Sequence, residues 1–261
     1  MHKLIVVGTG IKSISHLTEE TKRIIQNADK VLYLVNENHL KHWIQREAKN
    51  SESLEPMYFA HPKRIVAYQA ITDFIVDEYT KVSTLCVVFY GHPTVFADSA
   101  LKAVKQITQQ GGNAIILPAI SAQDCLYSDL KIDPGNQGCF SIEATELLIY
   151  ERKIDPFSHL IIWQIANLGS FNTNQTTKLN VLSDYLLHFY PSNQPICIYE
   201  APTLPLEKPR IEWSELNDFP NLEINSISML YIPPNHNTKL SDKYISLLEI
   251  DLDNFSSEVK T

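Results

Sequence analysis

Short runs of apolar, largely β-branched residues alternate along the chain with amphipathic segments, and this alternation constrains the fold more than any other feature. The apolar runs cover residues 3–8, 30–35, 85–90, 114–120, 159–165, 195–201 and 226–234. Helical periodicity predicts helices over residues 19–28, 38–49, 64–80, 98–109, 121–129, 143–150 and 178–190. Near-continuous apolar strands are typical of sheets covered on both faces, so the pattern predicts an α/β protein of mostly parallel βαβ units.

The chain of 261 residues is long enough for two ordinary domains. We expect two α/β domains instead of one closed barrel, because the regular βα units are too few for a barrel and the later connections are irregular. A strand that ends near Pro118 and a helix that opens at Ser121 place the boundary between them. The predicted domains are residues 1–118 and 119–235, followed by a tail over 236–261 that is either a docked helix or a frayed end.

Composition argues against several kinds of partner. The formal net charge of -8 argues against duplex nucleic acid, because neutralising phosphates requires a basic face. The four cysteines, Cys86, Cys125, Cys139 and Cys197, show no C-x-x-C spacing, so we interpret them as buried apolar residues in a reduced compartment and expect no metal. The apolar runs are too short to span a bilayer and no signal peptide is recognisable, so we expect no membrane association and a cytoplasmic location.

Three predicted strands end in loops of small residues, and in open α/β sheets such loops meet at the ligand-binding edge. Gly8 and Gly10 allow a sharp turn after the first strand, but a G-x-G without a third glycine is equally compatible with a plain tight turn. The second loop is Tyr90-Gly91-His92-Pro93. The third opens a helix at Ser121, where free backbone N–H groups suit a carboxylate or a ribose hydroxyl. Together the three loops predict a crevice.

A tyrosine and an arginine share one face of a predicted helix. Arg64 and Tyr68 are four residues apart, and a guanidinium beside a phenol favours the phenolate. The pair therefore predicts a tyrosine of lowered pKa that could act as a base. A surface arginine stacked on a surface tyrosine is the alternative, and the nearby Tyr58 and Tyr90 favour the catalytic interpretation.

The loops "VGTG", "YGHPTVF" and "PAISAQDCL", in this order, resemble the S-adenosylmethionine (SAM) loops of the tetrapyrrole methylase superfamily, the class III methyltransferases. "YGHPTVF", "SAQDCLYSDLKIDPGNQGCFSIEATELLI" and "HLIIWQIANLG" resemble more closely the borosin peptide backbone α-N-methyltransferases, which methylate main-chain amides of a precursor peptide. The resemblance covers roughly residues 3–235 and is most specific over 119–149. It implies two α/β domains with SAM in the interdomain cleft and an interlocked homodimer.

The resemblance also implies roles for individual residues. Tyr58, Arg64 and Tyr68 match the family's Tyr-x5-Arg-x3-Tyr catalytic motif, and Tyr90 matches the tyrosine before Gly-His-Pro. The candidate cofactor-binding residues are Gly8, Gly10, Tyr90, His92, Val95, Phe96, Ser121, Ala122, Gln164 and Ile165. The first loop lacks the Pro-Gly-Asp of tetrapyrrole methylases, so its individual contacts are not transferred. His92 either contacts SAM or is a loop histidine satisfied by its neighbours.

The implied function is SAM-dependent methylation of backbone amides, which yields S-adenosylhomocysteine (SAH) and needs no metal. Fused borosins continue into a hydrophobic core peptide, whereas the acidic tail before Thr261 contains no such segment. We therefore expect the split type, with the precursor peptide as a separate chain and a heterotetramer of two subunits and two peptides. One alternative is a class III methyltransferase for a small molecule such as a tetrapyrrole, and the other is a catalytically idle SAM- or peptide-binding module.

Overall fold

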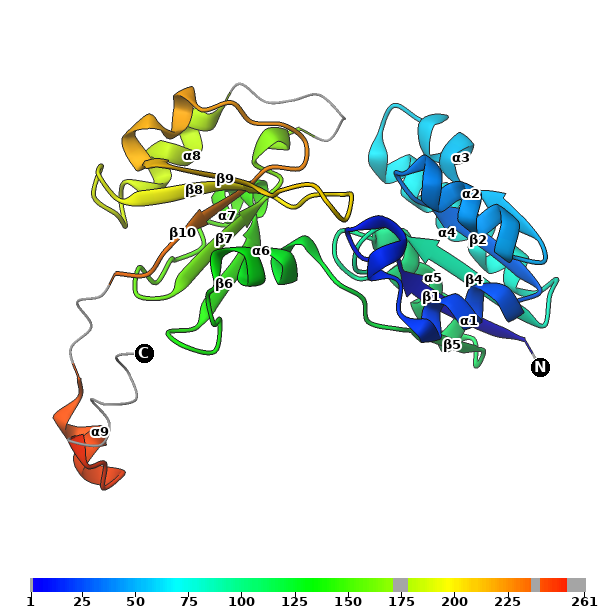
Figure 1. Ribbon diagram of the computed structural model, residues 1–261, viewed down its shortest axis with the longest axis horizontal. Helices are drawn as coiled ribbons and strands as arrows, with labels where there is room; N and C mark the ends of the chain where they lie inside the picture. The colour runs from blue at the N-terminus through cyan, green and yellow to red at the C-terminus, as the bar shows by residue number, and fades with distance from the viewer. Residues whose placement is uncertain (1, 171–177, 236–239, 253–261) are drawn as a thin grey trace.

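The computed structural model describes residues 2–170, 178–235 and 240–252, and its strands form two separate five-stranded sheets (Figure 1). The first sheet has the order β3-β2-β4-β1-β5, and all its neighbouring strands are parallel. Its strands are β1 (Lys3–Gly8), β2 (Lys30–Leu34), β3 (Ser51–Ser53), β4 (Thr84–Phe89) and β5 (Asn113–Ile116). Because the strands are parallel, the loops that follow β1, β2 and β4 leave the sheet at the same edge.

Helices cover both faces of the first sheet. On one face, α1 (Glu19–Asn27) and α2 (Asn38–Glu47) pack buried Ile25 and Ile44 against Val7 and Val88 of the sheet. The other face is covered by α3 (Glu55–Phe59), α4 (Arg64–Tyr79) and α5 (Asp98–Gln109). Side chains alternate between the faces of a strand, so a strand that is apolar at every position needs this double cover.

The second sheet has the order β6-β7-β10-β8-β9, and only its β6–β7 pair is parallel. Its strands are β6 (Cys139–Glu143), β7 (His159–Trp163), β8 (Pro195–Glu200), β9 (Arg210–Glu215) and β10 (Met229–Ile232). The prediction of mostly parallel strands is therefore correct for the first sheet and wrong for the second. The loop between β8 and β9 is too short for the crossover that parallel strands require, so the two strands form an antiparallel hairpin.

The second sheet is also covered on both faces. Buried Cys125 and Leu126 of α6 (Ala122–Leu130) belong to the apolar cluster on one face. The other face is packed by α7 (Ala144–Ile149), α8 (Leu179–Leu186) and the 3-10 helix η3 (Leu216–Asn221). Each sheet therefore has its own apolar core.

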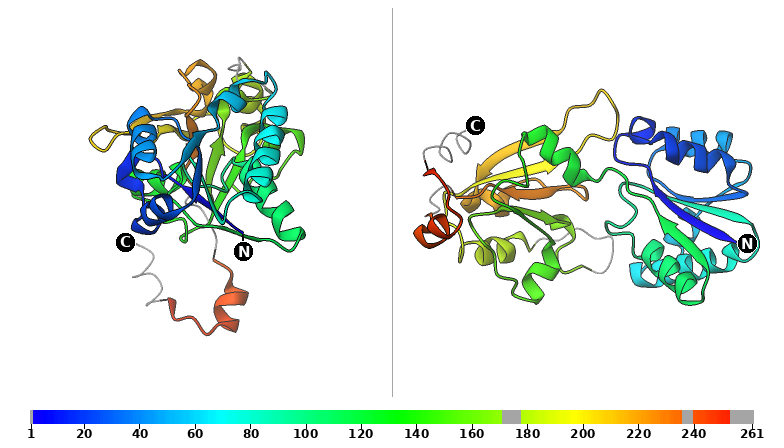
Figure 2. Two further views of the ribbon diagram at one scale, coloured as in Figure 1. Left: turned by 90° about the vertical axis from the view of Figure 1, so that its right-hand side faces the viewer. Right: turned by 90° about the horizontal axis from the view of Figure 1, so that it is seen from below.

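The chain passes from the first sheet to the second between β5 and α6, as the right-hand view of Figure 2 shows. Pro118 and Ala119, where the sequence places the domain boundary, lie in this connection. Ser121 caps α6 as predicted. Its side chain accepts a hydrogen bond from the Asp124 N–H, and the Asp124 carboxylate accepts one from the Ser121 N–H. In the tail, α9 (Asp242–Leu247) buries none of its residues and lies apart from both sheets (Figure 1).

The seven predicted helices are present, with ends that differ by at most a few residues from the sequence expectation. The apolar runs and helical periodicity do not predict β3, β6, β9 or α3. In β9 every second residue is exposed, and β3 consists of three polar residues at a sheet edge, so neither shows the apolar run used to recognise strands. Within the described ranges, no helix combines the length and the apolar character needed to cross a bilayer.

Candidate active site

A cavity of about 430 Å³ lies between the two sheets and is lined by residues of both. This volume falls within the range of pockets that hold cofactor-sized ligands. The first sheet contributes the loops after β1, β2 and β4 together with α3 and the start of α4. The second contributes the start of α6, the ends of β7 and β8, and the turn before β10.

Most of the residues singled out in the sequence line this one cavity. All four catalytic candidates do so, although they come from three different elements or loops. The lining candidates are Tyr58, Arg64, Tyr68, Tyr90, His92, Val95, Phe96, Ser121, Ala122 and Gln164. Gly8, Gly10 and Ile165 are not in the lining. Ile165 is instead fully buried in the core of the second sheet.

Gly8 and Gly10 have packing roles, and their assignment as cofactor-binding residues stays a prediction. A Cβ on Gly8 would lie 2.2 Å from the Gly91 carbonyl oxygen and 2.7 Å from the Pro93 ring, so only glycine fits there. Gly10 has a positive φ and forms a backbone bridge with Gly91. The first glycine loop therefore supports the loop after β4, and that second loop forms the cavity wall.

The tyrosine cluster comes from two consecutive helices. Tyr58 lies in α3 and Tyr68 in the second turn of α4, and their ring centroids are 6.0 Å apart. Arg64 is the first residue of α4, so it lies one turn before Tyr68 on the same side of the helix. The predicted helix and its shared face are thus present.

The pKa of Tyr68 is raised to about 12, which corrects the expectation of a lowered value. Burial is the main cause, and Tyr58 adds to it, while Arg64 acts in the opposite direction and is outweighed. Burial likewise raises the pKa of Tyr90 to about 12, and the nearby Glu37 carboxylate contributes. At neutral pH both phenols therefore keep their protons and can donate hydrogen bonds.

His92 and Ser121 line the cavity and also stabilise their own loops. The His92 Nδ1 lies 2.9 Å from the Thr94 hydroxyl, within the turn that follows β4. The Ser121 hydroxyl donates to the Asp124 carboxylate at 2.7 Å. Each residue therefore has a structural role whether or not it contacts a ligand.

Two residues with backbone strain face the cavity from opposite sheets. Phe96 and Gln164 have φ values of 54° and 55°, in the left-handed region that costs energy for residues other than glycine. The Phe96 ring contacts the Trp163 ring edge to face, with centroids 5.3 Å apart. Both aromatic residues line the cavity, so this contact joins its two sides.

Trp163 is a further lining residue that was not among the candidates, although it directly precedes the candidate Gln164. Its indole Nε1 donates to the Ser141 hydroxyl at 2.7 Å, and Ser141 donates to Gln123 of α6. This chain of hydrogen bonds fixes the orientation of the ring. The other missed lining residues include Asn36, Glu55, Phe59, Ala201 and residues 226–229, which carry no motif that would identify them.

Comparisons with known proteins agree with this architecture. Residues 3–211 match the family described as Tetrapyrrole (Corrin/Porphyrin) Methylases. Among solved structures, the methyltransferase CobJ superposes with a TM-score of 0.66 at 16% identity, covering 92% of this chain and 98% of CobJ. Uroporphyrin-III C-methyltransferase from Thermus thermophilus, complexed with S-adenosyl homocysteine, superposes with a TM-score of 0.60 at 14% identity. The superposition covers 88% of this chain and 92% of that structure. At these identities the superpositions show a shared fold.

Curated relatives include methyltransferase/ribosomally synthesized cyclic peptide precursors from fungi. A type I borosin precursor from Coprinopsis marcescibilis is 32% identical over 89% of this chain and 62% of its own length. The lentinulin A precursor of Lentinula edodes is 34% identical over 91% of this chain and 59% of its own length. The omphalotin A precursor of Omphalotus olearius is 34% identical over 88% of this chain and 57% of its own length. The chain thus spans about three fifths of their length. Since the family match extends over most of its residues, the chain belongs to the tetrapyrrole (corrin/porphyrin) methylase family.

Proposed function

We propose that this chain is a SAM-dependent methyltransferase that α-N-methylates backbone amides of a separate precursor peptide. One observation carries the proposal: Tyr58, Arg64, Tyr68 and Tyr90 meet in the cavity that the predicted cofactor loops also line. Family membership and the similarity to borosin precursors support it.

The residues that line the cavity fit SAM. A Cβ on Gly91 would approach no atom closer than 3.5 Å, so the backbone is open at this point and a ligand can come close. Aromatic rings of Tyr90, Phe96 and Trp163 line the cavity, and such rings attract cations. The chemistry that bound SAM would supply is an electrophilic methyl group on a positively charged sulfur.

An amide nitrogen is a poor nucleophile because its lone pair is delocalised over the carbonyl. Catalysis must therefore remove the N–H proton and stabilise negative charge on the carbonyl oxygen. In the proposed mechanism Tyr68 takes up or relays the amide proton, and Arg64 stabilises its phenolate. Tyr58 or Tyr90, both phenol donors in the cavity, donates to the developing imidate oxygen. The raised pKa makes the Tyr68 phenolate scarce at neutral pH but strongly basic once formed.

Tyr68→Phe tests this assignment. The variant removes the proton-accepting oxygen and keeps the ring, so we expect SAH binding and folding to be retained and methyl transfer to fall by at least about 100-fold. Tyr79→Phe is the matched control, since Tyr79 ends the same helix, its hydroxyl accepts from the Asn113 backbone N–H, and neither residue lines the cavity.

The assay incubates the purified protein with SAM and a short peptide encoded beside its gene. Mass spectrometry with fragmentation should locate added methyl groups on backbone nitrogens of the peptide. Methyl groups on the protein's own chain would contradict a separate precursor, and methylation of a tetrapyrrole alone would support the small-molecule alternative. Full activity of Tyr68→Phe would refute the role of Tyr68.

A further inference from the structure

The turn formed by residues 225–228 supplies part of the cavity wall, and a largely buried ion pair holds it. Ser226, Ile227, Ser228 and Met229 all line the cavity, as does Ala201 at the end of β8. We propose that Glu200 and Arg210 are positioning residues that hold this wall in its binding-competent shape. The proposal rests on the proposed function in that the ligand of the cavity is SAM or SAH.

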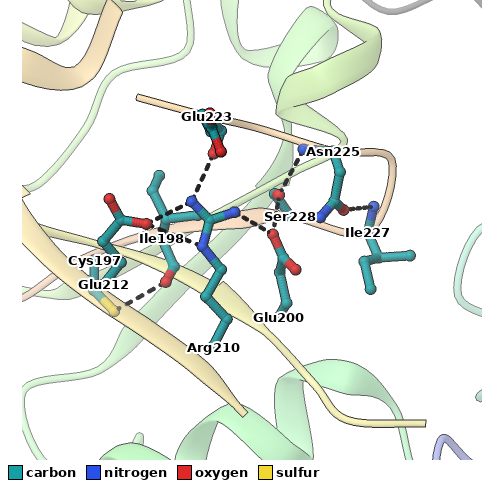
Figure 3. Close-up of polar contacts among 9 residues, drawn as sticks. All are labelled: Cys197, Ile198, Glu200, Arg210, Glu212, Glu223, Asn225, Ile227 and Ser228. Atoms are coloured by element: carbon teal, nitrogen blue, oxygen red, sulfur yellow. Dashed lines mark hydrogen bonds and ion pairs between the residues drawn. The ribbon is translucent and has the colours of Figure 1, made fainter. Parts of the chain in front are cut away.

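Glu200 is the residue through which the turn is attached to the sheet (Figure 3). Its carboxylate accepts a hydrogen bond of 2.6 Å from the Ser228 hydroxyl, and this hydroxyl accepts from the Asn225 N–H at 3.0 Å. The Asn225 side chain in turn accepts from the Ile227 N–H at 2.9 Å. The Glu200 carboxylate therefore attaches the turn to the sheet through Ser228, and its neighbour in sequence, Ala201, is itself in the cavity wall.

Arg210 joins three separate segments at this point. Its guanidinium donates to Glu200 at 2.6 Å, to Glu212 and, at 2.7 Å, to the Glu223 carbonyl oxygen ahead of the turn (Figure 3). The planar fork of an arginine can make such contacts together, whereas the single ammonium of a lysine cannot reproduce them. Arg210 thus fixes both the carboxylate and the chain that enters the turn.

The side chain of Glu200 is 13% exposed, that of Arg210 is 28% exposed, and Ser228 is buried. Burial acts to raise the pKa of Glu200, but the hydrogen bonds from Ser228, Asn225 and Arg210 outweigh it and hold the pKa below its usual value. The carboxylate is therefore charged at neutral pH. Removing its charge leaves Glu212 as the remaining carboxylate described for Arg210 and weakens the attachment of the turn.

Glu212 provides a matched control. It pairs with the same guanidinium, but its side chain is 43% exposed, and the contacts described for it do not involve the turn. Glu200→Gln and Glu212→Gln each remove one charge from Arg210. They differ in whether the altered residue holds the cavity wall.

The experiment measures SAH binding to the full chain by calorimetry. We expect Glu200→Gln to weaken binding about tenfold and Glu212→Gln less than about twofold. Ser228→Ala, which removes only the hydroxyl that attaches the turn, should weaken binding by a similar factor, and the double variant should lose little more than either single one. Thermal unfolding without SAH identifies any variant that is merely misfolded.

A pH series separates positioning from general stability. Because the pKa of Glu200 is lowered, its charge is lost only as the pH falls through that value, so wild-type affinity for SAH should decrease there. Glu212→Gln should keep this decrease and Glu200→Gln should lack it. Equal binding by wild type and folded Glu200→Gln would overturn the positioning role. Failure of the wild type to bind SAH would instead overturn the proposed function.

Discussion

At the scale of single residues, opposing influences set the pKa of Tyr68. The spacing of Arg64 and Tyr68 along a helix does not show which influence is larger. The four-residue separation from Arg64 correctly indicated a shared face and the direction of the arginine's effect. Burial and the contact with Tyr58 depend on the tertiary structure, and they reverse the net shift. Tyr68 is therefore a protonated phenol in the ligand-free protein, close to a positive charge that favours its ionised form.

This raised value gives a specific pH dependence. If Tyr68 must lose its proton for catalysis, the reactive fraction increases as the pH rises toward its pKa of about 12. We expect kcat/KM for peptide methylation to increase about tenfold per pH unit from neutral to mildly alkaline conditions. Steady-state rates across this range would test the expectation, and a plateau near neutrality would contradict it.

At the scale of elements, the apolar runs identified β1, β2 and β4 nearly to the residue, because these strands are buried on both faces. They also located the three loops that follow β1, β4 and β5. The elements that were missed are those whose stability comes from pairing with a neighbour, such as β9 against β8. The wall at residues 226–229 was missed for a related reason, since the contacts with Glu200 and Arg210 join segments distant in sequence.

The close contact between the loops after β1 and β4 predicts that adding one methyl group at Gly8 lowers the free energy of unfolding substantially. Gly8→Ala would place a methyl group against the Gly91 carbonyl oxygen, a backbone atom that cannot easily move. We expect a loss of about 3 kcal/mol in the free energy of unfolding. Denaturant titrations should show a smaller loss, about 1–2 kcal/mol, for Gly111→Ala, where a positive φ is strained but no atom lies within 4 Å. Equal losses would argue against close packing at Gly8.

At the scale of the whole molecule, the cavity is the feature that depends on both sheets. Each sheet has its own core, and the lining residues are divided between them. The sequence predicted two α/β domains and the residues on the loops, but not the antiparallel pairing of most strands in the second sheet. It could not give the relative placement of the two sheets, since no local pattern encodes it.

Ligand binding should therefore stabilise both halves together. Hydrogen exchange at the backbone amides of β4 and of β8 follows each half separately and leaves Trp163 in the cavity wall unchanged. With SAH at about 100 times its Kd, we expect the opening free energy of both strands to gain about 2.7 kcal/mol. Stabilisation of one half alone would contradict binding between the sheets.

The lining of the cavity extends in sequence from Ile11 to Met229. During synthesis on the ribosome, the first sheet and its glycine loops can fold early, since domains commonly form in the order of translation. The opposite wall, however, is made only when the turn before β10 has emerged and met Glu200. If the cavity binds SAM as proposed, a nascent chain carries the tyrosine cluster long before it can retain a methyl donor, and cofactor binding must wait until residues 225–229 have been translated.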